Sequence, residues 1–155
     1  MATHTHAGKA EMLIRRPIAE VFHAFVEPAV LTRFWLDSAS GPLAKGARVQ
    51  WHFMVPGAVE TTTVTAFDEP RRIAFDWSDG VHVQLDFEDL GDGSTRASVD
   101  VSGFTGDEAV DGVVGATEGF AIVLCDLKTL LETGRSGGLV KDRAALIARS
   151  MPRGG

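Results

Sequence analysis

Short segments of alternating apolar and polar residues fill the middle of the chain. Val49, Trp51 and Phe53 alternate with polar neighbours, which is the period of a strand with one buried face. Turn residues, among them the hairpin pair Asp79-Gly80, separate the segments, so neighbouring strands are predicted to be antiparallel. With a first strand near 12–15, the pattern predicts about six strands. The later segments are residues 60–67, 73–77, 81–88 and 96–101.

Helical spacing lies between the first strand and the others. Pro17 suits a first helical position, because its missing N–H would have no partner there. Val21, Phe22 and Phe25 then fall on one face. Pro28 ends this helix, since proline disfavours helical geometry in the residue before it. A second short helix is predicted to follow and to end in two aromatic residues.

A long amphipathic helix is predicted over 107–133. Gly112, Gly115 and Gly119 are three and four residues apart in its first half and share a face. Each glycine costs about 0.5–1 kcal/mol relative to alanine inside a helix, so the row indicates close packing or clearance for a ligand. In a further alternative the helix begins only near Gly115, and 107–114 is a mobile gate.

The predicted sheet has one apolar face, which another element must cover. The long helix is the candidate cover, and the helices of 18–35 are predicted to close one end. A register error of one residue would expose a dozen large apolar side chains, so these are assigned inward. The inward set is Val49, Trp51, Phe53, Ile73, Phe75, Trp77, Val81, Val83, Leu85, Phe87, Val99 and Val101, and the outward titratable set is His52, Asp76, His82, Asp86, Glu88 and Asp100.

This element order resembles the START-like (SRPBCC, helix-grip, Bet v 1-like) superfamily. The proline and aromatic positions of 14–35, the turn and strand of 64–77 and the helix of 119–134 are most similar to the branch of the C-terminal domain of the activator of Hsp90 ATPase. The resemblance covers about residues 10–134. It implies an α+β fold, in which a curved antiparallel sheet wraps around a long C-terminal helix and encloses a cavity.

The resemblance also sets the expected domain limits. It places one domain at 10–134, a flexible N-terminus at 1–9 and a C-terminal extension at 135–155. A short helix in the extension would have Leu139, Ala144, Leu146, Ile147 and Met151 on its apolar side, and Lys141, Asp142, Arg143 and Arg149 toward water. This helix would pack on the domain, cap the pocket entrance or form a contact in a homodimer, and the sequence leaves these alternatives open.

Composition excludes several kinds of partner. The net charge of −6 argues against nucleic-acid binding and against adhesion to anionic membranes. No apolar run approaches the roughly 20 residues of a membrane span, and the N-terminus has no apolar core of a secretory signal. The single cysteine excludes an internal disulfide and thiolate metal clusters. The expectation is a cytoplasmic protein without membrane insertion, metal or cofactor.

Catalytic groups are few. The chain has no tyrosine, so a phenol cannot polarise a carbonyl here. The remaining candidate acids, bases and nucleophiles lie on helices: His23, Glu118, Cys125 and Asp126. A lone histidine or cysteine at the positions of His23 and Cys125 is more often structural than catalytic. No catalytic residue is therefore assigned.

A cavity with apolar walls predicts a binding protein for a small hydrophobic molecule. The alternative, that the aromatic residues simply fill the core, stays open. The expected lining combines strand residues, threonines for polar contacts and the glycine-bearing helix face: Trp51, Phe53, Thr61, Thr63, Phe75, Trp77, Val83, Leu85, Gly115, Thr117, Gly119 and Phe120.

Two other functions are alternatives. One is an enzyme of the polyketide cyclase or aromatase kind, which shares the fold and needs polar groups in the cavity. The other is a co-chaperone-like domain acting on Hsp90. An Hsp90 partner is not expected, because the resemblance covers only one of the activator's two domains, and the other supplies much of the chaperone contact.

Overall fold

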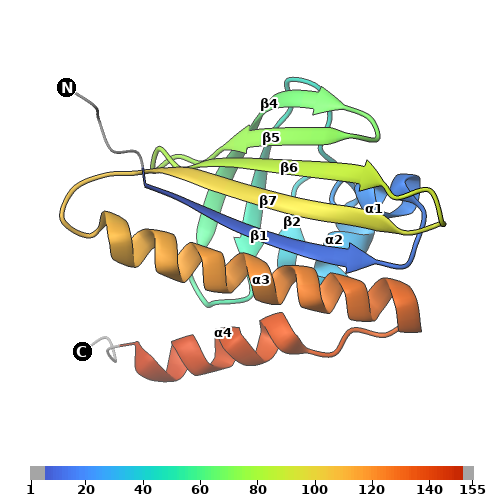
Figure 1. The fold of residues 1–155 in the computed structure, drawn as a ribbon. Coiled ribbons are helices and arrows are strands. Elements are labelled where there is room, and N and C mark those ends of the chain that lie inside the picture. Colours follow the sequence, from blue (N-terminus) through green and yellow to red (C-terminus); the bar gives the residue numbers. More distant parts are fainter. Residues whose placement is uncertain (1–5, 152–155) are drawn as a thin grey trace.

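Seven strands form one antiparallel sheet in the computed structural model, which describes residues 6–151 (Figure 1). The strands are β1 (His6–Ile14), β2 (Leu36–Ala39), β3 (Arg48–Phe53), β4 (Val59–Asp68), β5 (Arg72–Asp76), β6 (His82–Asp89) and β7 (Thr95–Phe104). Their spatial order is β1-β7-β6-β5-β4-β3-β2, so each strand from β2 to β7 lies beside its neighbour in sequence and β1 joins the far edge. The helices are α1 (Ile18–Ala24), α2 (Pro28–Phe34), α3 (Ala109–Thr133) and α4 (Leu139–Ser150).

The helix-grip fold is confirmed, and the strand count needs correction. The strand that the sequence did not predict is β2, whose four residues are too few to show a clear alternation. It follows α2 directly, and Leu36 pairs with Phe53 of β3. The predicted flexible N-terminus is wrong for 6–9, because β1 begins at His6 and pairs with β7 from there. Residues 1–5 of that prediction lie outside the described residues.

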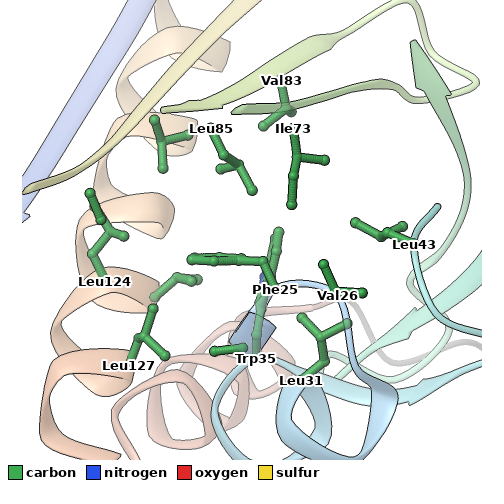
Figure 2. Close-up of a cluster of buried hydrophobic side chains, with 14 of the residues drawn as sticks. Phe25, Val26, Leu31, Trp35, Leu43, Ile73, Val83, Leu85, Leu124 and Leu127 are labelled. Atoms are coloured by element: carbon green, nitrogen blue, oxygen red, sulfur yellow. The ribbon is translucent and has the colours of Figure 1, made fainter. Parts of the chain in front are cut away.

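In β3, β5, β6 and β7 the strand register is as the alternation predicted. The inward set is buried or half-buried, and the titratable residues of β3, β5, β6 and β7 face the other side. Figure 2 shows how Ile73, Val83 and Leu85 of the sheet point toward Phe25 and Trp35, the residues that directly follow α1 and α2. Most of the aromatic ring pairs pack edge to face, among them Trp35 and Trp51 with centroids 5.0 Å apart. Most of the space between sheet and helices is therefore a packed core.

Helix α3 lies across β1 and β7 (Figure 1). It is helical from Ala109, so the alternative of a mobile gate over 107–114 is wrong. Its close approach to β1 depends on Gly8, since a side chain there would collide with the Thr117 hydroxyl. The helix ends at Gly134, which caps it in the left-handed conformation at φ 82°.

The predicted C-terminal helix exists as α4, and it packs along α3 on the side away from β1 (Figure 1). The link between the two helices is fixed by Asp126, a carboxylate only 1% exposed. Its oxygens accept hydrogen bonds from the Ser136 hydroxyl at 2.9 and 3.0 Å and from the Gly137 N–H at 2.8 Å. A buried carboxylate needs such donors, so Asp126 holds the start of the link between α3 and α4 against α3.

Candidate functional site

A pocket of about 270 Å³ lies between α3, α4 and the hairpin that joins β3 to β4. We call it the α3–α4 pocket. Nearly all of its lining is apolar, and among the described residues Arg143 is the one charged side chain that lines it. The lining residues are Trp35, Phe53, Met54, Val55, Ala58, Trp77, Gly115, Ala116, Gly119, Phe120, Ile122, Val123, Val140, Arg143 and Ala144.

Aromatic rings form the inner wall of the α3–α4 pocket. Trp77 and Phe120 are stacked with an angle of 10° between their planes and centroids 6.2 Å apart. Trp35 meets Phe120 edge to face at 5.6 Å. The Trp77 indole N–H donates to the Thr62 hydroxyl at 3.0 Å, which fixes the orientation of this ring. The rings are thus held by the core and present their free surfaces to the pocket.

The β3–β4 hairpin and α4 form the outer walls. Phe53 N–H donates to Ala58 O at 2.9 Å, and Ala58 N–H donates to Val55 O at 3.1 Å, so the hairpin closes as a tight turn. Helix α4 contributes Val140, Arg143 and Ala144. The C-terminal extension therefore forms part of the pocket. Of the three roles predicted for its helix, α4 packs on the domain and covers one side of the pocket.

Five of the predicted lining residues meet in the α3–α4 pocket: Phe53, Trp77, Gly115, Gly119 and Phe120. Four others, Trp51, Phe75, Val83 and Leu85, are at most 1% exposed and belong to the packed core. These four side chains therefore fill the core, as the alternative interpretation of the sequence predicted.

The predicted threonines do not reach the pocket. Thr62 pairs with Val49 in the inward register and is fully buried, so Thr61 and Thr63 lie on the outer face of β4. The prediction was wrong by one residue, because a run of threonines has no alternation to fix its register. Thr117 turns toward β1 instead, and its hydroxyl donates to Val113 O at 2.7 Å.

The glycine row on α3 serves both predicted purposes, close packing and clearance for the pocket. A methyl group at Gly112 would lie 2.7 Å from a ring carbon of Phe104, which is close packing. At Gly115 the same group would meet no atom within 4 Å, and Gly115 faces the pocket. At Gly119 it would lie 3.5 Å from Nη1 of Arg143. Clearance for the pocket therefore comes from one glycine of the row.

Most of the α4 residues that line the pocket were not predicted from the sequence. Arg143 was predicted to face water, yet its side chain is 29% exposed and lines the pocket. Leu146, predicted on the apolar side, is 66% exposed. The packed face of α4 runs through Val140, Ala144 and Ile147. The spacing of these three residues could have predicted the packed face, because i, i+4 and i+7 positions share a helix face.

The candidate catalytic groups lie outside the α3–α4 pocket. His23 is exposed on α1, and its ring lies 3.9 Å from the Glu27 carboxylate. Glu118 is 63% exposed and accepts a hydrogen bond from Arg143 at 3.3 Å. Asp126 is committed to the α3–α4 link, and Cys125 is a half-buried free thiol. Within residues 6–151, no three His, Cys, Asp or Glu side chains are grouped to hold a metal ion.

A curved antiparallel sheet, two short helices, a long C-terminal helix and a pocket beside that helix define the START-like, helix-grip class of protein. Residues 15–132, more than half of the chain, match the family model described as Activator of Hsp90 ATPase homolog 1-like protein. The chain belongs to this family. In the part of the chain that the structure describes, no helix has both the length and the apolar character to cross a membrane.

Solved structures share the fold. SSP2350 from Staphylococcus saprophyticus is 24% identical with a TM-score of 0.74, over 84% of this chain and 95% of that one. The Aha1 dimer from Colwellia psychrerythraea is 17% identical with a TM-score of 0.75, over 84% and 99%. CalU16 from Micromonospora echinospora is 17% identical with a TM-score of 0.65, over 97% and 98%, so that match extends into α4. No curated protein matches the sequence significantly.

Proposed function

We propose that the protein binds a small hydrophobic molecule in the α3–α4 pocket, without catalysing a reaction on it. The observation that carries the proposal is a 270 Å³ space with apolar walls from the sheet, α3 and α4. Ligand sites have this composition, and their usual range of about 300–1,000 Å³ indicates a ligand at the small end. A cavity of about 150 Å³ holds benzene, so one or two rings would fit.

The proposal includes a cytoplasmic location. Two experiments test for protein partners, a second copy of the chain and an Hsp90. Size-exclusion chromatography with light scattering will test a homodimer, the state in which the Colwellia relative was solved. Mixing the protein with an Hsp90 will test the co-chaperone alternative, and unchanged ATP turnover is the expected result.

Titration with 2-naphthylmethanol tests ligand binding directly. We expect calorimetry to detect saturable binding to the natural protein. Gly115→Leu should abolish it, because the new side chain enters the pocket without meeting any atom near its Cβ. Val114→Leu is the matched control, since Val114 is 60% exposed on the same helix and does not line the pocket.

Native mass spectrometry of protein purified from its own host gives a second readout. We expect a bound molecule in the natural protein and none in Gly115→Leu. Absence of both naphthylmethanol binding and a co-purified molecule would refute the proposed function.

A further inference from the structure

Arg143 is an unusual wall residue for an apolar pocket. It projects from α4 between Val140 and Ala144, which line the same space. Its guanidinium lies against Gly119 of α3, where an added methyl group would be 3.5 Å from Nη1 and 3.7 Å from Cζ. The guanidinium thus packs over the backbone of Gly119, between the two helices.

The hydrogen bonds of Arg143 leave donors unused. A guanidinium has five N–H donors. Nε donates to Glu118 Oε1 at 3.3 Å and Nη2 donates to Gly115 O at 3.5 Å, and both distances are long for a charged donor. Among the described residues, Nη1 donates to no acceptor. Glu118 is 63% exposed, so water weakens its pairing with Arg143.

A half-buried cation with free donors at an apolar pocket fits one kind of ligand. We propose that the ligand carries a single carboxylate on a ring-containing apolar body, and that Arg143 binds this carboxylate. This inference rests on the proposed function of the α3–α4 pocket. The planar fork of a guanidinium matches a carboxylate with two parallel hydrogen bonds. A single cation with Glu118 beside it, in a protein of net charge −6, suits one negative charge better than two.

The test compares two ligands that share a ring system. 2-Naphthoate carries a carboxylate where 2-naphthylmethanol carries a neutral hydroxymethyl group. By calorimetry we expect the natural protein to bind the naphthoate at least tenfold more tightly. Arg143→Met should remove this preference while the alcohol still binds. Arg149→Met is the matched control, because it removes the same charge from α4 at a residue that does not line the pocket.

A second variant protects the test against a folding defect in Arg143→Met. Glu118→Gln removes the carboxylate that competes for the guanidinium. We expect it to tighten naphthoate binding severalfold and to leave the affinity for the alcohol unchanged.

The outcomes separate this inference from the proposed function. If the alcohol binds and the naphthoate binds no more tightly, the assignment of Arg143 is wrong and the apolar pocket stands. Persistence of the preference in Arg143→Met, or no response of the naphthoate to Glu118→Gln, would overturn the assignment as well. If neither ligand binds the natural protein, this inference fails, and the proposed function fails with it when no molecule co-purifies either.

Discussion

The glycine row of α3 offers a controlled measurement of what each missing side chain does. Gly112, Gly115 and Gly119 lie in one helix, so alanine gains the same backbone preference at each, about 0.5–1 kcal/mol. The surroundings differ. Gly115→Ala meets no atom within 4 Å and should keep the whole gain, which corresponds to a rise in Tm of roughly 1–4 °C.

The other two positions should deviate in a defined order. Gly119→Ala makes an ordinary contact with Arg143 at 3.5 Å and should be nearly as stabilising. Gly112→Ala places its methyl group 2.7 Å from the Phe104 ring, and overpacking of this kind costs about 1–3 kcal/mol. The helix gain offsets part of this cost, so we expect a net loss of about 1 kcal/mol.

Urea unfolding at 25 °C, followed by circular dichroism, measures all three variants against the natural protein. The free energy of unfolding should rank Gly115→Ala highest, Gly119→Ala next and Gly112→Ala below the natural protein. Equal stabilisation by Gly112→Ala and Gly115→Ala would refute the reasoning, because the free energy of unfolding would then not depend on the space around each Cβ. A lower stability of Gly115→Ala would show that the pocket is closed in solution.

Two further predictions concern carboxylates that anchor α3. Asp126→Asn should lower the free energy of unfolding by about 1–3 kcal/mol, because the linker donors lose a charged acceptor; urea unfolding will show this, and an unchanged midpoint would contradict it. Burial would raise the pKa of Glu132, but the Arg15 N–H and the Lys128 ammonium outweigh it and hold the pKa below its ordinary 4.5. Its stabilisation is therefore complete at neutral pH and is lost as the pH falls through the lowered pKa. Glu132→Gln should cost about 1 kcal/mol at pH 7 and progressively less below pH 4.5 in thermal melts, whereas a cost independent of pH would exclude the charge as its cause.

The sequence carried enough information for the sheet, because alternation over several long strands defines one buried face. A shift of β6 by one residue would expose Val83 and Leu85 to water, so only one register keeps these side chains buried. The same rule explains the errors. Within Thr61–Thr63 all residues are alike, and β2 has only four residues, so neither segment shows which side faces the core.

The pocket was harder to predict than the fold, because its walls come from elements far apart in the chain. Phe53 and Trp77 could be assigned inward from their own strands, but which inward residues stay accessible depends on where α4 docks. Asp126 contributes to that docking, because its bonds to Ser136 and Gly137 hold the link between the two helices against α3. A carboxylate next to a cysteine in an apolar helix gives no sign of such a role in the sequence.

The docking of α4 also decides the chemistry of the site. An isolated α4 would place Arg143 in water with its charged neighbours, as its composition predicts. Packed against α3, the same side chain lies over Gly119 and beside Gly115, at the border of an apolar space. Displacement of α4 would therefore remove an apolar wall and the Arg143 cation of the pocket together. If the assignment of Arg143 is right, Asp126→Asn should weaken naphthoate binding more than alcohol binding, although Asp126 touches neither ligand.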